Sequence, residues 1–189
     1  GQLIVRNATA LTAVTSKLQQ GLSNHQLINK NTVIVPNVVD THRFTVASTK
    51  PKQQIILHVS CFDERAKNGK GILRAYQQLQ NKGYKDTQLL MVGDGPDKLA
   101  VEAYAKELGL KNVHFTGLLE GNQLIKHYQE ASIFVLFSHY ETFGVVLIEA
   151  LACGIPVIAT NSGGIPDIIN PSNGILVSPN NEGELTNAM

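Results

Sequence analysis

Residues 133–160 read IFVLFSHYETFGVVLIEALACGIPVIAT and contain a complete strand–helix–strand pattern. The apolar runs at 133–137 and 156–159 are short and nearly continuous, as strands covered on both faces are. Between them, residues 144–152 are apolar nearly all round, which predicts a buried helix. Two strands joined in this way form the βαβ unit of a parallel sheet.

The same alternation continues on both sides of this unit. Apolar stripes at helical spacing occur at 71–81, 99–108 and 124–131. Further strands are expected at 32–35, 54–59, 88–92, 113–116 and 174–177, and a strand-like run at 10–14 precedes a short helix. We therefore expect an α/β fold around a parallel sheet. The Pro-, Ser-, Thr- and Lys-rich stretch at 46–53 is the clearest linker.

The composition and net charge of the chain argue against several classes of protein. A chain of 189 residues with 43% hydrophobic and 16% charged residues can bury one sizeable core. Its formal net charge of +1 favours neither nucleic acid nor an anionic membrane as a partner. No apolar run reaches the roughly 20 residues of a membrane-spanning helix or resembles a signal peptide. We expect a cytoplasmic protein cut from a longer chain, since both ends look arbitrary.

Two other kinds of site are disfavoured by spacing. Cys61 and Cys153 are far apart and belong to no metal-binding pattern, so neither a disulfide framework nor a zinc site is expected. The turn VGDGP at 92–96 does not extend to G-x-G-x-x-G, because Lys98 stands where the third glycine would. This excludes the dinucleotide fingerprint.

Ligands of open α/β sheets bind where strand ends lead into helix N-termini. The loop at 61–71 carries three cations just before a helix, namely Arg65, Lys67 and Lys70. Cations and free helix N–H groups complement a diphosphate, although a solvated charged loop gives the same pattern. Leu118 and Leu119, in a later loop, could lie against a nucleotide base or simply pack the loop.

The strongest candidate site is a pair of glutamates around a glycine. Glu149 lies in an otherwise apolar helix, where a carboxylate is costly unless a polar group such as a ligand hydroxyl satisfies it. Glu141 precedes that helix. One of the two carboxylates could bind the hydroxyls of a ribose and the other could contact a second sugar, while the amide of Gly144 stays open to a phosphate between the two sugars. The alternative is that Glu149 forms a buried ion pair with Lys or Arg and that Glu141 caps the helix.

This run, continued through residue 179, resembles the signature of the retaining glycosyltransferases of family 4 (group 1), in which a Glu is followed by seven residues and another Glu. VIVPNVVDTHRF at 33–44 resembles the interdomain segment of that family, and VHFTG at 113–117 resembles its mid-domain strand and loop. The resemblance implies a GT-B architecture of two Rossmann-like domains, each a doubly wound parallel sheet. This chain would be the C-terminal, donor-binding half.

The resemblance also implies a reaction and a division of the chain. A sugar would pass from a nucleotide-diphosphate-sugar to a carbohydrate or other hydroxyl acceptor, with retained configuration and without a metal or other cofactor. Residues 1–45 would be the end of the N-terminal domain and the interdomain segment. Residues 46–189 would be the nucleotide-sugar-binding domain, truncated at its C-terminal end. The missing domain would bind the acceptor and make any peripheral membrane contact, so this chain alone would be inactive.

Site residues follow from the same resemblance. Glu149 would bind the ribose, and the catalytic candidates are Glu141 at the transferred sugar and Lys67 with Arg65 at the diphosphate. The other donor-binding candidates are Gly144, Phe143, Thr142, Leu118, Leu119 and Lys70.

The chain departs from the family pattern at two places. Cys61, Phe62 and Asp63 stand where the family has an Arg, so Arg65, Lys67 and Lys70 compete for two roles, and the first two are favoured. Asp167 replaces a usual Glu and is expected to be structural. His139 and Tyr140 are expected at the rim, and Cys153 in the core. Two other functions stay open, a GT-B nucleotide-sugar epimerase and a non-catalytic nucleotide-sugar-binding module.

Overall fold

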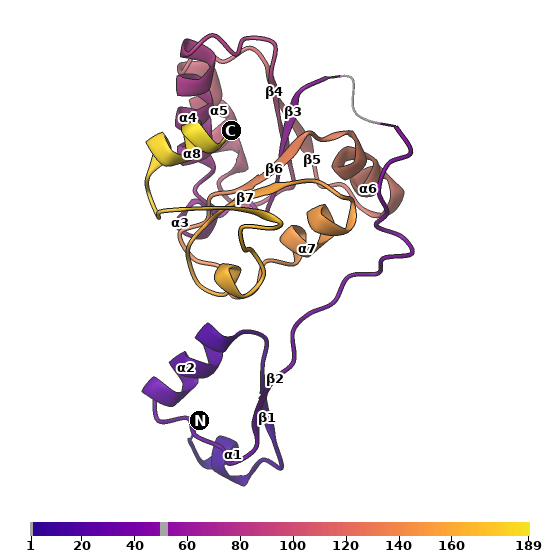
Figure 1. Ribbon diagram of the computed structural model, residues 1–189. Helices are drawn as coiled ribbons and strands as arrows, with labels where there is room; N and C mark the ends of the chain where they lie inside the picture. Colours follow the sequence, from indigo (N-terminus) through magenta and orange to yellow (C-terminus); the bar gives the residue numbers. More distant parts are fainter. Residues whose placement is uncertain (1, 50–52) are drawn as a thin grey trace.

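The computed structural model describes residues 2–49 and 53–189, and its main body is built on a six-stranded parallel sheet (Figure 1). The strand order is β5-β4-β3-β6-β7-β8. From β3 the chain adds strands on one side and then returns to add β6 on the other side of β3, which is the doubly wound arrangement expected from the sequence. The strands are β3 (Ile55–Val59), β4 (Gln88–Val92), β5 (Val113–Gly117), β6 (Ile133–Leu136), β7 (Val157–Thr160) and β8 (Gly174–Val177).

Helices cover both faces of this sheet. One face carries α4 (Gly69–Asn81), α5 (Lys98–Glu107) and α8 (Glu182–Ala188), and the other carries α6 (Gly121–Glu130) and α7 (Val145–Ala152). Ile56 and Leu57, neighbours in β3, belong to different buried clusters because successive strand side chains point to opposite faces. The continuous apolar runs in the sequence reflect this burial on both faces.

The expected elements are present, with small shifts at their ends. α4 begins at Gly69 because the side chain of Asn68 caps it by accepting from the amide of Gly71. A short helix, α3 (Glu64–Lys67), lies in the cationic loop and is capped by Asp63. A 3₁₀ turn, η1 (Ile165–Asp167), follows β7.

The expectation that α7 is a buried helix holds for only one side of it. Its buried residues are Leu147 and Ala150, whereas Val145 is 40% exposed. The helix packs one side on the sheet and turns other apolar residues toward a cavity, which a sequence pattern does not separate from burial.

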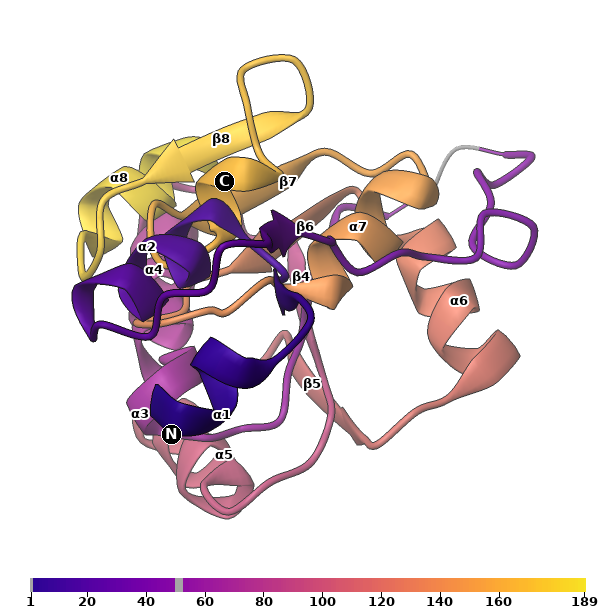
Figure 2. The same cartoon turned by 90° about the horizontal axis from the view of Figure 1, so that it is seen from below.

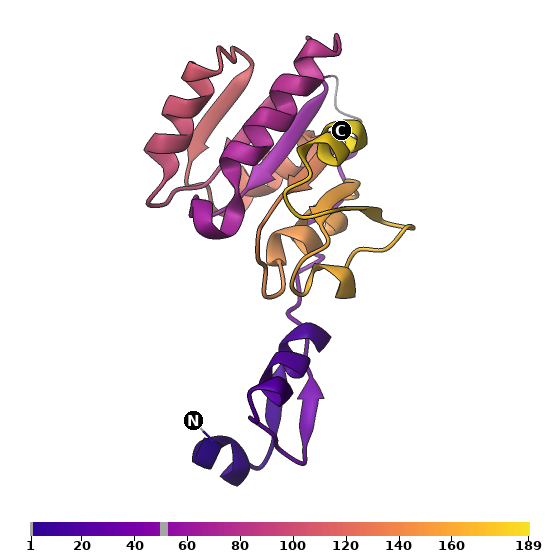
Figure 3. The same ribbon diagram turned by 90° about the vertical axis from the view of Figure 1, so that its left-hand side faces the viewer.

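Residues 2–34 form a smaller unit that is not part of the main sheet. It contains α1 (Gln2–Asn7), β1 (Leu11–Ala13), α2 (Ser16–Asn24) and β2 (Thr32–Ile34), and its two strands pair in parallel with each other. The expected strand at 32–35 therefore exists but does not join the six-stranded sheet. Figures 1 and 3 show this unit below the main body and joined to it by an extended segment, and Figure 2 shows it from below.

Hydrogen bonds tie this smaller unit to the main body at the start of α2. Thr15 caps α2 and also donates from Oγ1 to the carbonyl of Thr142, at 3.1 Å. The amide and hydroxyl of Ser16 each donate to the carboxylate of Asp167, at 2.6 Å. Asp167 thus makes the kind of structural contact that the sequence led us to expect.

Two further expectations concern the connecting segment and membranes. Residues 46–49 of the expected linker are irregular, and its residues 50–52 lie outside the described residues. Over the part of the chain that is described, no helix combines the length and the apolar character needed to span a bilayer.

Candidate functional site

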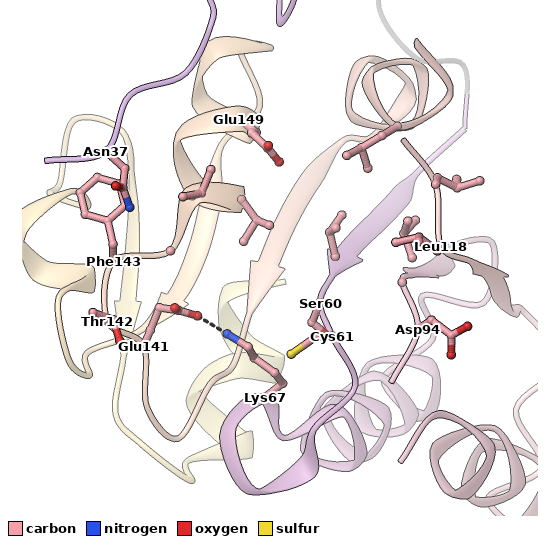
Figure 4. A pocket seen from close by; sticks show the side chains of 18 of the residues that line it. Asn37, Ser60, Cys61, Lys67, Asp94, Leu118, Glu141, Thr142, Phe143 and Glu149 are labelled. Carbon is pink, nitrogen blue, oxygen red and sulfur yellow. Dashed lines mark hydrogen bonds and ion pairs between the residues drawn. The ribbon is translucent and has the colours of Figure 1, made fainter. Parts of the chain in front are cut away.

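A cavity of about 580 Å³ opens at the carboxyl ends of the main strands (Figure 4). Its volume is within the range of roughly 300–1,000 Å³ that is usual for small-molecule sites. The walls come from the ends of β3 and β4, the end of α3, the loop before α6, and the loop and helix after β6. Val14 of the smaller unit and Asn37 of the segment that follows it complete the lining. Its polar or charged lining residues are Asn37, Ser60, Lys67, Asp94, Glu141, Thr142 and Glu149.

Glu149 projects from α7 into this cavity and is held by a buried tyrosine. The hydroxyl of Tyr128, on α6, donates to Oε2 of Glu149 at 2.8 Å. No lysine or arginine in residues 2–49 and 53–189 forms an ion pair with Glu149, so the alternative of a buried pair with a cation is wrong for the described chain. Burial raises the pKa of Glu149, and the bond from Tyr128 partly opposes that rise.

Tyr128 is a donor in this pair at all ordinary pH values. Its pKa is well above its usual value because it is buried and faces the carboxylate of Glu149. Tyr128 therefore keeps its proton and donates a hydrogen bond to Oε2 of Glu149. The other carboxylate oxygen of Glu149 can accept from another donor.

Glu141 forms an ion pair with Lys67 inside the cavity. The two side chains are 13% and 18% exposed, respectively. Their loops are also joined through the backbone, since the amide of His139 donates to the carbonyl of Ala66 at 2.8 Å. Glu141 does not cap α7, because Gly144 occupies the cap position and no side chain bonds to the first turn. The capping alternative is therefore wrong.

Gly144 leaves the start of α7 open toward the cavity. Its φ of 90° is a conformation that L side chains rarely adopt, and a Cβ there would lie 2.8 Å from Leu147. The first amides of a helix have no partner within the helix and attract anions. The site thus places Glu141 before the N-terminus of α7 and Glu149 within that helix, both in the lining of one cavity.

Gly163 and Gly164 pack against the backbone of the loop that carries Glu141. A Cβ on Gly163 would lie 1.9 Å from the carbonyl oxygen of Glu141, and one on Gly164 would lie 2.3 Å from that of Thr142. The amide of Gly164 also donates to the carbonyl of Glu141, at 2.9 Å. Side chains here would push the loop away, so these glycines position Glu141.

The three cations of the 61–71 loop are separated by the structure. Lys67 lines the cavity. The side chain of Arg65 is 89% exposed, is bonded to Asp63 and does not line the cavity. Lys70 also lies outside the lining, with Nζ 5.6 Å from the centre of the Tyr104 ring. Because Asp63 caps α3 and pairs with Arg65, the short helix presents Lys67 inward and Arg65 outward.

The family model for glycosyl transferases group 1 matches residues 40–189. This chain belongs to the group 1 glycosyltransferases. N-acetyl-alpha-D-glucosaminyl L-malate synthase of Bacillus anthracis is 30% identical over 177 residues, which are 87% of this chain and 45% of that protein.

Solved structures agree with this membership. Sucrose-phosphate synthase of Thermosynechococcus elongatus superposes with a TM-score of 0.85 at 29% identity, over 99% of this chain and 49% of that one. HepE of Anabaena, solved with UDP-glucose, has a TM-score of 0.83 at 21% identity over 98% of this chain and 54% of that one, which shows a shared fold. The chain spans about half the length of these relatives. The fold is that of one half of a GT-B glycosyltransferase.

The other expected donor-binding residues of this group 1 glycosyltransferase, apart from Lys70, also line the cavity. They are Leu118, Leu119, Thr142, Phe143 and Gly144. Phe143 is buried, whereas Leu118 is 67% exposed and free to cover a flat ligand. His139 and Tyr140 do not line the cavity, and Cys153 is a buried core residue.

Several residues in or behind the cavity wall were not among the predicted site residues. Val14 comes from the unit of residues 2–34 and Asn37 from the segment that follows it, and their approach depends on how that part of the chain packs. Ser60 lines the cavity just after β3, and His58 lies behind it with no exposed surface. A polar His in a central strand was the one signal in the sequence that pointed to this pair.

Two further observations concern possible metal ligands and the hydroxyl of Ser138. No group of three His, Cys, Asp or Glu residues in residues 2–49 and 53–189 is arranged to hold a metal ion. The hydroxyl of Ser138, two residues after β6, is buried and has no hydrogen-bond partner among the residues that the structure describes. It does not line the cavity.

Proposed function

We propose that this chain is the donor-binding domain of a retaining glycosyltransferase that moves a sugar from a nucleotide-diphosphate-sugar to a hydroxyl acceptor. The observation that carries this proposal is the cavity in which Glu149, Glu141 and Lys67 meet beside the open N-terminus of α7. Its anionic and cationic groups alternate as the hydroxyls and phosphates of such a donor do.

Each part of the donor has a matching group in the cavity. The free oxygen of Glu149 accepts from ribose hydroxyls, with Leu118 and Leu119 beside the base. Lys67 and the first amides of α7 bind the diphosphate, because both supply positive charge. Glu141 accepts from a hydroxyl of the transferred sugar. Arg65 and Lys70 would have to leave their present partners, Asp63 and Tyr104, to join the diphosphate site.

The chemistry proposed for the site is stabilisation of the leaving group. As the bond between sugar and diphosphate breaks, negative charge grows on the departing phosphate. Lys67 and the helix amides face that charge, and fixed donors of this kind lower the transition state more than the ground state. We propose that they do so without a metal or other cofactor.

The rest of the proposal concerns the whole protein. We propose that residues 1–45 belong to the N-terminal domain and interdomain segment, and that this domain binds the acceptor and any membrane surface. The relatives' greater length supports a second domain, and the presence of Val14 and Asn37 in the cavity lining supports a role for residues 1–45 at the site. We propose a cytoplasmic location, which suits the two free cysteines, Cys61 and Cys153.

Calorimetric titration of the chain with UDP, GDP, ADP and their glucose conjugates tests the proposal. At least one conjugate should bind, and the E149A substitution should weaken that binding while Arg65→Ala, outside the cavity, serves as the matched control. Equal affinities for wild type and E149A would contradict the assignment of the cavity. With the full-length parent and an acceptor, sugar transfer should follow; donor epimerisation without an acceptor, or binding without turnover, would instead indicate the two rival functions.

A further inference from the structure

A buried imidazole links the core to the cavity wall. His58, in β3, is fully buried, and its two ring nitrogens have different partners. Nδ1 lies 2.9 Å from the carbonyl oxygen of Val135, and Nε2 lies 2.8 Å from Oγ of Ser60. None of the contacts proposed above for the nucleotide-sugar involves His58 or Ser60.

The partners of His58 determine where its proton lies. A carbonyl oxygen can only accept, so Nδ1 must carry a hydrogen and donate to Val135. Burial lowers the pKa of His58 to about 4, so the ring is neutral near pH 7 and carries no second hydrogen. Nε2 is therefore an acceptor, and the hydroxyl of Ser60 must donate to it.

This assignment leaves Ser60 with one free hydrogen-bonding position. A serine hydroxyl has one hydrogen and two lone pairs. The hydrogen points to His58, and one lone pair accepts from the amide of Phe62 at 3.3 Å. Ser60 is half-buried at the tip of β3 and lines the cavity, so the second lone pair is available to a ligand (Figure 4).

We propose that Ser60 binds a hydroxyl group of the nucleotide-sugar purely as an acceptor, and that His58 is the positioning residue that holds it in this state. The inference rests on the proposed function of the cavity. A phosphate oxygen has no hydrogen to donate and is excluded from this position, whereas a ribose or sugar hydroxyl fits it. Ser60 thus belongs to the hydroxyl-binding part of the cavity, whereas Lys67 belongs to the anion-binding part.

The protonation state can be measured without any ligand. Nitrogen-15 NMR of the labelled chain at pH 7 should show His58 with its hydrogen on Nδ1 and a bare Nε2. The S60A substitution should move the Nε2 resonance, because the bond from the hydroxyl is lost. A hydrogen on Nε2 in the wild-type chain would overturn the inference, whatever the cavity binds.

The ligand contact is tested by calorimetry with the glucose conjugate that the wild-type chain binds best and with its parent nucleoside diphosphate. The Ser60→Ala variant should lose about 3- to 10-fold in affinity for the conjugate, as expected for one neutral hydrogen bond, and Ser60→Thr should recover most of it. A loss with both ligands places the hydroxyl on the ribose, and a loss with the conjugate alone places it on the transferred sugar.

A matched control separates this contact from a general effect on the site. Ser138→Ala removes a buried hydroxyl that does not line the cavity, and it should leave both affinities unchanged. If Ser60→Ala binds both ligands as tightly as wild type, the inference is overturned while the proposed function stands. If the wild-type chain binds no nucleotide or conjugate, the proposed function is overturned and this inference falls with it.

Discussion

Lys67 and Glu141 form an ion pair although they lie in loops that follow different strands, β3 and β6. The two strands are neighbours in the sheet, so their carboxyl ends bring the loops together. Both side chains are mostly buried, which makes removal of one partner costly for the other. A bound diphosphate would give Lys67 a second anionic partner and leave Glu141 free to turn toward a sugar.

The first prediction concerns the turnover of the full-length enzyme. K67A should lower kcat by about 10²- to 10³-fold, the usual effect of removing one group that stabilises charge in the transition state. The KM for the donor should change less, because the amides of α7 still bind the ground-state diphosphate. Steady-state kinetics with a saturating acceptor measure both quantities.

R65A provides the matched control for that measurement. Its guanidinium is exposed and paired with Asp63, so kcat should stay within about 3-fold of wild type, in line with the small energies of exposed ion pairs. An Arg65→Ala defect as large as that of Lys67→Ala would show that the loop rearranges when the donor binds. The geometry of α3 would then not represent the working site.

The second prediction concerns the pH dependence of nucleotide binding. Ribose hydroxyls donate to the ionised form of Glu149, so affinity should fall as the pH drops through the pKa of Glu149, which burial places above its ordinary value. Glu149→Gln should bind about 10- to 100-fold more weakly at pH 7, as expected for bonds to a charged group, and should lose this pH dependence. Calorimetry across a pH series measures both effects.

The Tyr128→Phe substitution tests the same carboxylate by removing its hydrogen-bond donor. The tyrosine bond lowers the pKa of Glu149, so its removal should move the midpoint of the pH dependence upward while the fold is kept. An unchanged midpoint in Tyr128→Phe would mean that a group other than Glu149 titrates.

Much of the fold could be predicted from local patterns. β4 and β8 occupy 88–92 and 174–177 as expected, because short apolar runs bounded by turn residues identify strands covered on both faces. The separate pairing of β1 with β2 could not be predicted, since periodicity identifies a strand but not its partner. The open side of α7 was missed for a similar reason, because an apolar residue beside a cavity looks like a core residue.

A site residue could be predicted from the sequence where its type is unusual for the helix or strand that contains it. Glu149 in an apolar helix is such a residue, and it lines the cavity. The meeting of Lys67 with Glu141 depends on the adjacency of β3 and β6, which no local pattern contains. The outward direction of Arg65 depends on the cap that Asp63 makes, and the contact of Ser60 depends on a buried ring behind it.

The third prediction concerns stability in acid. His58 has a pKa of about 4 in the folded chain and 6.5 as its ordinary value, so between these pH values the unfolded chain binds a proton that the folded chain does not. The free energy of unfolding should therefore fall as the pH is lowered from 6.5 to 4, by about 3 kcal/mol from this residue. Urea unfolding at several pH values measures the slope.

The slope should be smaller in His58→Gln, which carries no titratable group, even if that variant is less stable at every pH. Equal slopes in the two proteins would assign the acid sensitivity to other groups.

The fourth prediction concerns the unpartnered hydroxyl of Ser138. This group is fully buried and forms no hydrogen bond within residues 2–49 and 53–189, so folding removes its bonds to water without replacing them. S138A should raise the free energy of unfolding by about 1 kcal/mol, because the variant has no such group to desolvate. Ser132→Ala is the contrasting substitution, since that hydroxyl donates to the carbonyl of Gln53 and accepts from the amide of Ile55, and its loss should destabilise the chain. A decrease in stability for Ser138→Ala as large as that for Ser132→Ala would show that a buried water satisfies the Ser138 hydroxyl.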